Sequence, residues 1–294
     1  MPKKNLILVT GGAGFVGTNL IKLLLKKTKF NILSLDNYSS GNKKNHIRHS
    51  KVRYIKGNTA NINLLIKNPS RIKTIFHFGE FARIYQSFTK MNECIESNSV
   101  GSNAVFNFCL KHNIKLIYSA TSASLGNKGN DKNLSPYAFT KSKNLELLEN
   151  LKKWFKFKYE VIYFYNVYGP HQICKGQMST VIGIFEDHYK KRKPLPVVRP
   201  GTQTRRFTHI DDTVNVCYTA WKKNFCRHYS IASRKTHSII DVAKMFDTKI
   251  KYLPKRAGER YASAIITKNL SNKIYKHFGY INLKDYIKEF IRNN

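Results

Sequence analysis

One short stretch near the start of the chain constrains its fold most strongly. Asn5–Thr10 is a nearly continuous apolar run, which is typical of a strand buried on both faces of a parallel sheet. Gly11, Gly14 and Gly17 follow, and a helical pattern of apolar residues then continues through Leu25. Glycines between a strand and a helix permit a tight turn and let a pyrophosphate approach the backbone, while the helix N-terminus offers it free N–H groups. The stretch therefore predicts a dinucleotide-binding unit.

A second strand and the acid at its end narrow the choice of dinucleotide. Phe30–Leu35 is expected to be a buried strand that ends at Asp36. An acid about twenty residues beyond the last glycine hydrogen-bonds the adenosine ribose hydroxyls of NAD and repels a 2′-phosphate. We therefore expect NAD as the cofactor, although Lys43 and Lys44 could serve a 2′-phosphate and leave NADP open.

Strands and helices continue to alternate through the first half of the chain. Strands are expected at 52–56, 74–78 and 114–118, and a long helix at 91–112. This alternation predicts an α/β fold, a Rossmann-type doubly wound parallel sheet. Ligands of such sheets sit at the carboxyl ends of the strands, so Thr121, just after the strand at 114–118, is expected close to the cofactor.

The second half of the sequence is less regular. We expect one short strand there, at 195–198, and helices at 178–191, 211–221, 238–246 and 267–278. We assign residues 1–165 to an NAD-binding Rossmann domain and residues 166–294 to a smaller substrate-binding α/β lobe that interleaves with it.

A tyrosine and a lysine four residues apart carry the first indication of chemistry. Tyr137 and Lys141 follow Ser135-Pro136, and apolar residues at helical spacing continue through Phe155. On a helix, residues four apart lie on one face, and Pro136 suits the first turn. An ammonium beside a phenol favours the phenolate and lowers its pKa. A tyrosine placed in this way can take a proton from an alcohol near neutral pH.

Charge and cysteine usage exclude several other classes of protein. The chain has 52 Lys and Arg against 17 Asp and Glu, a net charge of +35. The lysines are scattered, and no arginine-rich block, zinc-finger spacing or aromatic-basic RNA signature occurs, so nucleic acid is a disfavoured partner, whereas a diphosphate would be attracted. Five cysteines without a CxxC pair, and no signal peptide or long apolar run, predict a reduced cytoplasmic protein without structural metal or membrane span.

Several motifs in order now carry a family resemblance. The chain resembles the extended short-chain dehydrogenase/reductases, in particular the NAD-dependent epimerase/dehydratase family that acts on nucleotide sugars. The resemblance spans essentially the whole chain and rests on the segments 10–17, 35–37, 118–126, 135–141, 165–170, 201–212 and 256–259.

The resemblance implies a role for individual residues. The catalytic positions are Thr121, Tyr137 and Lys141. The cofactor positions are Gly11, Gly14, Phe15, Val16, Asp36, Asn37, Asn58, Thr59, Phe78, Gly79, Tyr137, Lys141 and Phe164. The substrate positions are Thr121, Tyr137, Asn166, Lys175, Arg205, Arg256 and Glu259. Arginines and an amide suit a diphosphate, and a carboxylate suits the vicinal hydroxyls of a ribose.

Departures from the family pattern narrow the choice among the reactions that the family performs. Dehydratases of the family resemble one another in an Asp-Glu pair after the catalytic Thr, where this chain has Ser122-Ala123, so dehydration is disfavoured. Phe78-Gly79-Glu80 replaces the more usual small residues. The remaining pattern most resembles UDP-glucose 4-epimerases. That resemblance implies that Tyr137 takes the proton of the sugar 4-hydroxyl while C4 gives a hydride to NAD, and that the keto sugar then turns over and is reduced on its other face.

Other functions stay open. Lys175-Gly176-Gln177-Met178 resembles a stretch of ADP-heptose 6-epimerases in which the lysine is a second acid or base. A reductase, an epimerase of a uronic or N-acetylated sugar, and a non-enzymatic dinucleotide-binding or RNA-associated protein are further alternatives. The family resemblance also implies a homodimer formed through the helices at about 91–112 and 137–155.

Overall fold

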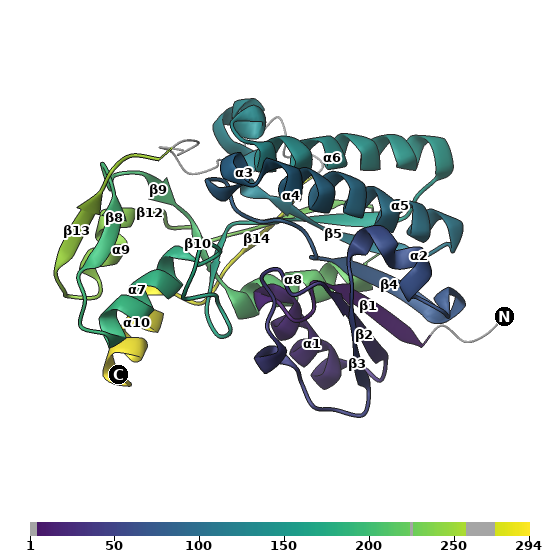
Figure 1. Ribbon diagram of the computed structural model, residues 1–294, viewed down its shortest axis with the longest axis horizontal. Helices are drawn as coiled ribbons and strands as arrows, with labels where there is room; N and C mark the ends of the chain where they lie inside the picture. Colours follow the sequence, from purple (N-terminus) through teal and green to yellow (C-terminus); the bar gives the residue numbers. More distant parts are fainter. Residues whose placement is uncertain (1–4, 224–225, 257–273) are drawn as a thin grey trace.

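A parallel sheet of eight strands forms the centre of the molecule. The computed structural model describes residues 5–223, 226–256 and 274–294 (Figure 1). The strand order is β14-β11-β6-β5-β4-β1-β2-β3, and every neighbouring pair is parallel. The strands are β1 (Leu6–Thr10), β2 (Asn31–Asp36), β3 (Val52–Lys56), β4 (Ile72–His77), β5 (Lys115–Thr121), β6 (Tyr159–Phe164), β11 (His228–Ala232) and β14 (Ile274–Phe278). The predicted Rossmann-type doubly wound sheet is confirmed.

Helices cover both faces of this sheet, because its strands are apolar on both sides. On one face lie α1 (Phe15–Lys27) and α8 (Ile210–Lys222), which pack against each other. On the other face lie α2 (Ile62–Leu65), α5 (Ser102–Lys111) and α6 (Pro136–Phe155). Figure 1 shows the sheet edge-on between these two layers. The sheet is thus buried, and its carboxyl edge is left to carry the site.

The long helix expected at 91–112 is continuous in space but changes its winding. It consists of α4 (Met91–Ile95), a π-helical stretch η4 (Glu96–Gly101) and α5. π-helical turns are rare and often mark functional sites. The turn brings Asn98, a fully buried residue, to the part of the molecule where α6 begins.

The smaller lobe is built from short elements and has its own core. Three two-stranded sheets pair β7 with β10, β8 with β13, and β9 with β12. Their bounds are β7 (Asn166–Tyr168), β8 (Leu195–Val198), β9 (Thr204–Arg205), β10 (Phe207–His209), β12 (His237–Ser238) and β13 (Ile250–Leu253). Aromatic and aliphatic side chains of these strands pack with α7 (Val181–Lys190), α9 (Ile239–Lys244) and α10 (Leu283–Arg292). The chain crosses between the lobes, since α8, β11 and β14 all lie after residue 165 and belong to the larger layer structure.

One expected helix is wrong in part. Of the segment 267–278, residues 267–273 lie outside the described part of the chain, and Ile274–Phe278 is strand β14, paired in parallel with β11. Local spacing predicted a helix, but the chain returns here to the open edge of the sheet, where pairing with β11 satisfies its backbone. No helix in the described ranges is long and apolar enough to cross a bilayer.

Candidate active site

The turn between β1 and α1 is shaped for close approach of a ligand to the backbone. Gly11 has φ of +70°, and a Cβ there would lie 2.8 Å from the backbone of Gly79. A Cβ on Gly17 would lie 2.2 Å from the carbonyl oxygen of Gly11. Helix α1 begins after Gly14, which has no side chain to cap it, and carries no acid in its first turn. The turn therefore fits the pyrophosphate of a dinucleotide, as the sequence predicts.

Asp36 stands at the end of β2, beside this turn. Its carboxylate accepts hydrogen bonds from the backbone N–H groups of Ala13, at 2.9 Å, and Tyr38, at 2.8 Å. Burial raises the pKa of Asp36, and these two bonds oppose the rise. A Cβ on Gly41 would lie 2.8 Å from the carboxylate, so the following loop wraps closely over it.

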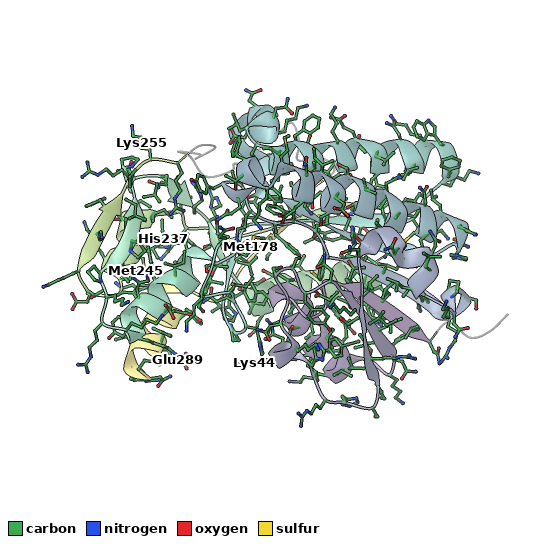
Figure 2. All side chains as sticks on the ribbon, in the orientation of Figure 1. Lys44, Met178, His237, Met245, Lys255 and Glu289 are labelled. Carbon is green, nitrogen blue, oxygen red and sulfur yellow. The ribbon has the colours of Figure 1, made fainter. Side chains whose placement is uncertain are left out.

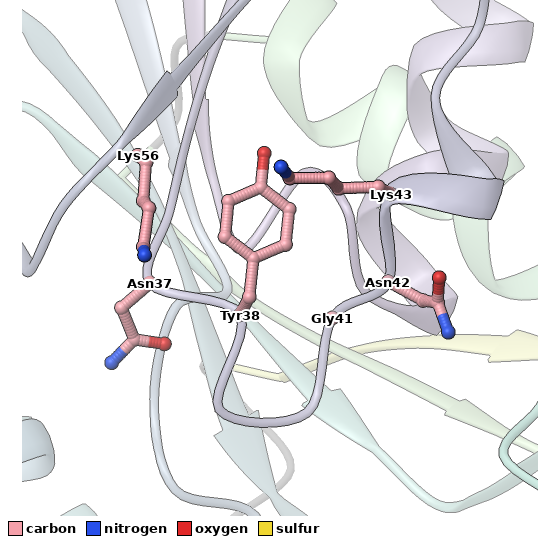
Figure 3. Close-up of a pocket in the computed structure, with 6 residues that line it drawn as sticks. All are labelled: Asn37, Tyr38, Gly41, Asn42, Lys43 and Lys56. Carbon is pink, nitrogen blue, oxygen red and sulfur yellow. The ribbon is translucent and has the colours of Figure 1, made fainter.

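The loop after Asp36 borders an open pocket of about 520 Å³. Figure 3 shows its lining residues, Asn37, Tyr38, Gly41, Asn42, Lys43 and Lys56. The Asn37 side chain donates a hydrogen bond to Asn58 Oδ1 at 2.7 Å, so two predicted cofactor residues are in contact. Thr59 is buried against Gly101 of η4. The pocket thus lies where the adenosine half of a dinucleotide is expected, with Asp36 beneath the loop and two lysines at its rim.

Helix α6 carries Tyr137 and Lys141, and its start is well defined. Ser135 caps it by accepting from the N–H of Ala138 at 3.1 Å, and Pro136 occupies the first turn. Tyr137 and Lys141 are both buried. Thr121, the last residue of β5 rather than a residue after it, is also buried, and its hydroxyl accepts from the N–H of Ala123 at 3.2 Å. The three predicted catalytic residues thus come from two adjoining elements, β5 and α6, which pack together.

Glu80 is the partner of Lys141, and sequence reasoning gave it no role. The Lys141 ammonium forms an ion pair with the Glu80 carboxylate and donates to the carbonyl oxygen of Ser119 at 2.5 Å. Both charged side chains are nearly inaccessible to solvent. Burial lowers the pKa of Lys141, and the Glu80 charge opposes that effect. The ammonium also lies 4.8 Å from the centre of the Tyr118 ring.

Four hydroxyl and amide donors surround Glu80, one of them the Ser119 hydroxyl at 3.3 Å. Ser102 and Tyr118 donate to it at 2.9 and 3.0 Å, and Asn144 at 3.4 Å. Ser102 also lies 3.0 Å from His77 Nε2, and His77 Nδ1 lies 2.7 Å from Thr10 Oγ1. Burial lowers the pKa of His77 to about 4, so this imidazole is neutral. A chain of hydrogen bonds therefore runs from Lys141 to the end of β1, with its buried charges balanced.

Asn98 fixes the segment that carries Glu80. Its side chain exchanges hydrogen bonds with the backbone of Phe81, accepting at 2.7 Å and donating at 3.0 Å. It also donates to Thr140 of α6 at 3.2 Å. The backbone of Asn98 accepts from Asn144 at 2.6 Å. The π-helical turn of η4 therefore locks the segment after β4 against the helix that holds Tyr137 and Lys141.

Arg83 also lies close to Tyr137, and sequence reasoning missed it as well. Its guanidinium donates to the carbonyl oxygen of Ala82 at 2.7 Å and to that of Met178. Met178, labelled in Figure 2, lies between the two lobes, and its side chain packs in the cluster around Tyr137. Burial lowers the pKa of Arg83, while the charge of Tyr137 opposes this. The signal that could have found it is its place three residues after Glu80, in the segment where the family pattern breaks.

The predicted substrate residues of the smaller lobe are placed less uniformly. Asn166 is bonded to the carbonyl oxygen of Arg206 through its backbone at 3.2 Å and through its side chain at 3.4 Å. Arg205 donates to the carbonyl oxygen of Thr204 at 2.8 Å. The Arg256 guanidinium lies 5.4 Å from the centre of the Tyr85 ring, so the smaller lobe reaches the segment after β4. Glu259 lies outside the described residues.

Lys175 lies at the surface. Its side chain is 73% exposed, and its ammonium lies 3.7 Å from Asp187 of α7. Phe164, by contrast, lies at the carboxyl end of β6, where its ring meets that of Phe78 with centroids 5.6 Å apart. Two predicted cofactor residues, Phe164 and Phe78, are thus in contact. Lys175, in contrast, forms an ion pair at the surface.

The fold and this arrangement define the class of protein. A parallel sheet with a glycine turn after its first strand, an acid after its second and a Tyr-Lys pair on a helix beside β5 characterise the Rossmann-type short-chain dehydrogenases and reductases. Residues 7–232 match the model of the NAD dependent epimerase/dehydratase family. The chain belongs to this family.

Individual relatives differ in the reactions named for them. The chain is 29% identical over 255 residues, 81% of its own length and 79% of the relative, to an ADP-L-glycero-D-manno-heptose-6-epimerase of Brachyspira hyodysenteriae. It is 25% identical over 302 residues, 97% of each chain, to a putative UDP-glucose 4-epimerase of Methanocaldococcus jannaschii. In structure it is similar to the UDP-glucose 4-epimerase of Thermotoga maritima, with a TM-score of 0.86 over 98% of this chain and 99% of that one, at 22% identity. The relatives therefore agree on nucleotide-sugar epimerases and disagree on the sugar.

Proposed function

We propose that the protein is a nucleotide-sugar 4-epimerase that uses NAD. The observation that carries the proposal is the position of Tyr137, which is buried at the start of α6, the helix that packs against β5, whose last residue is Thr121. The residues after Thr121 are Ser122 and Ala123, which cannot act as the acid and base that elimination of water requires. A reaction that needs one acid/base hydroxyl fits this set better than dehydration.

Tyr137, Thr121 and Lys141 have separate roles in the proposed epimerisation. Tyr137 takes the proton of the sugar 4-hydroxyl and later returns it, and Thr121 hydrogen-bonds the same oxygen. Lys141, one turn after Tyr137 on the same helix, is held in place by Glu80 and the carbonyl of Ser119. NAD, when bound at the glycine turn and Asp36, supplies the hydride acceptor for the oxidation and the hydride donor for the reduction. Exclusion of water by the buried walls protects the keto sugar between the two steps.

Asp36 supports NAD rather than NADP. Its carboxylate is fixed by two backbone N–H groups at the end of β2, where a 2′-phosphate would meet a negative charge. Lys43 and Lys56, which line the pocket, reduce that repulsion (Figure 3). Dinucleotide released from purified, denatured protein and identified by mass spectrometry tests the choice. Recovery of NADP alone would overturn it.

A reaction at C6 of an ADP-heptose is the second candidate, favoured by the identity to the Brachyspira relative. The second acid or base it requires would be Lys175, and the exposure of that side chain and its pairing with Asp187 support the C4 reaction instead. Incubation with UDP-hexoses and with ADP-heptose separates the two. Interconversion of a UDP-linked sugar and its 4-epimer supports the proposal, and turnover of ADP-heptose alone would refute it.

We also propose a homodimer formed through α4, η4 and α6. These elements expose large apolar side chains, including Met91, Val100, Phe139 and Trp154. Such a set on neighbouring helices is typical of an interface between protein chains. Sedimentation at micromolar concentration should show a dimer that Phe139→Asp combined with Met91→Asp converts to monomer. A monomer in the unaltered protein would contradict the proposal.

A further inference from the structure

Two cations lie close to the segment that holds Tyr137, the buried Lys141 and the half-buried Arg83, and within the described residues only Lys141 has a counter-ion. We propose that the other, Arg83, binds a carboxylate that the sugar carries beside its reacting carbon, so that the substrate is an acidic nucleotide sugar. The inference rests on the proposed 4-epimerase function and adds the substrate class to it.

The hydrogen bonds of Arg83 leave its charge uncompensated. Its two terminal nitrogens donate to main-chain carbonyls, which carry no net charge. Its Nε is buried and has no hydrogen-bond partner. Within the described ranges, no carboxylate forms an ion pair with Arg83, and Glu80, only three residues away, is taken by Lys141. A half-buried guanidinium with a buried, unpartnered Nε and no anion beside it is costly, so the geometry leaves a place for one.

A merely structural role would not require this charge. Arg83 ties the segment after β4 to residue 178 of the smaller lobe. Gln86, on the same segment, makes the same kind of tie with a neutral amide, which donates to the carbonyl oxygen of Gln177 at 2.6 Å. Since an uncharged donor suffices to join these segments, the guanidinium supplies something beyond the tie.

The location of Arg83 indicates which part of the substrate it meets. Phe81, Ile84 and Met178, the residues around Arg83 in sequence and space, all pack in the cluster that contains Tyr137. If Tyr137 holds the 4-hydroxyl, the groups nearest to it are those on C3 and C5 of the sugar. A carboxylate on C5, as in a uronic acid, or on an ether of O3 would therefore lie next to Arg83. A guanidinium binds a carboxylate through paired, charge-assisted hydrogen bonds, which a neutral hydroxymethyl group cannot match.

Binding measurements on the NAD-loaded protein test this assignment. UDP-glucuronate and UDP-glucose differ only in the carboxylate at C5, and UDP-N-acetylmuramate carries its carboxylate on O3. We expect one of the two acids to bind about 30-fold more tightly than UDP-glucose by calorimetry, in line with hydrogen bonds to charged groups. Which acid binds tightly distinguishes the two sources of the carboxylate.

Substitutions of Arg83 test whether this residue causes the preference for an acidic nucleotide sugar. In Arg83→Met the ratio of the Kd values of the neutral and acidic sugars should fall to near one, and Arg83→Lys should retain part of it. The ratio cancels any general loss of affinity, and thermal unfolding shows whether each variant is folded. Arg53→Met, an exposed position on β3, is the matched control and should keep the full ratio.

Four results would overturn the inference or the function on which it rests. Equal affinity of the unaltered protein for acidic and neutral sugars, or an unchanged ratio in Arg83→Met, would remove Arg83 as a carboxylate site. Tight, Arg83-dependent binding of an acidic sugar without formation of its 4-epimer would refute the epimerase while supporting the site. A failure of every UDP-sugar to bind would overturn both.

Discussion

The buried Lys141 and the half-buried Arg83 are two cations with different surroundings. Lys141 is bound by Glu80, and a set of hydroxyl and amide donors surrounds that carboxylate. Arg83 meets only neutral carbonyls and keeps a free, buried Nε. A compensated buried charge can serve as a fixed part of the framework, whereas an uncompensated one is stabilised only when a ligand arrives. The comparison assigns Lys141 and Glu80 to the permanent site and Arg83 to the substrate.

Removal of the Tyr137 hydroxyl should have the largest effect, a loss of turnover. Tyr137→Phe should lower kcat by about 10³-fold, because no other described group is placed to exchange the proton of the 4-hydroxyl. The Kd of the nucleotide sugar should change by less than about threefold, since one hydrogen bond to a neutral hydroxyl contributes little to binding. Steady-state kinetics and calorimetry measure the two quantities. An equal loss of binding and turnover would show that Tyr137 is structural.

Separation of Lys141 from its counter-ion should destabilise the fold. Glu80→Gln keeps the shape of the side chain and leaves a buried ammonium unpaired, so the free energy of unfolding should fall by about 3 kcal/mol. Lys141→Met in the same background should recover part of this loss, because the charge that needs a partner is gone. Urea denaturation of the single and double variants measures the coupling. Additive effects would mean that the pair is not energetically linked, and the contrast with Arg83 would lose its basis.

The neutral histidine at the end of the Lys141 network should make stability depend on pH. Folded His77 takes up its proton only near pH 4, whereas an unfolded histidine does so near pH 6.5. The unfolded state therefore binds more protons between these values, and stability should fall by up to about 3 kcal/mol as the pH drops from 7 to 4.

A comparison of two variants separates the contribution of His77 to this pH dependence from that of other ionisable groups, among them Asp36, Glu80 and the nearby Lys141. His77→Asn retains groups that can bond Thr10 and Ser102, and it should show a flatter decline in unfolding free energy than the unaltered protein. His49→Asn, at an exposed position, should leave the decline unchanged. Parallel curves for all three proteins would show that His77 is not the group responsible.

The smallest effect is expected at the exposed lysine of the smaller lobe. Lys175→Met should change kcat by less than about threefold, because an exposed ion pair contributes little and the side chain is turned to solvent. Lys191→Met, which removes the other partner of Asp187, is the matched control. A selective loss of activity in Lys175→Met would mean that the loop closes over the substrate, and it would revive the reaction at C6.

Much of the larger domain could be predicted because its signals are local. The glycine turn, Asp36 and the placement of Tyr137 and Lys141 on one helix each depend on spacing within one strand, turn or helix. The strand at 195–198 follows from a short apolar run, and the strand at 52–56 follows from Val52, Tyr54 and Ile55, residue types that favour strands. Strand β14 could not be found in this way, because its pairing partner, β11, lies more than forty residues earlier in the sequence.

The sequence by itself determined the fold class and the dinucleotide turn, since these depend on residues close together in the chain, and through the family resemblance it predicted the Thr-Tyr-Lys set. Only the tertiary structure decided which charges are balanced. Glu80 meets Lys141 across 61 residues, and Arg83 meets the carbonyl of Met178 across 95. The energy of a buried charge depends on every neighbour that packing brings within a few ångströms, and no local pattern contains that information.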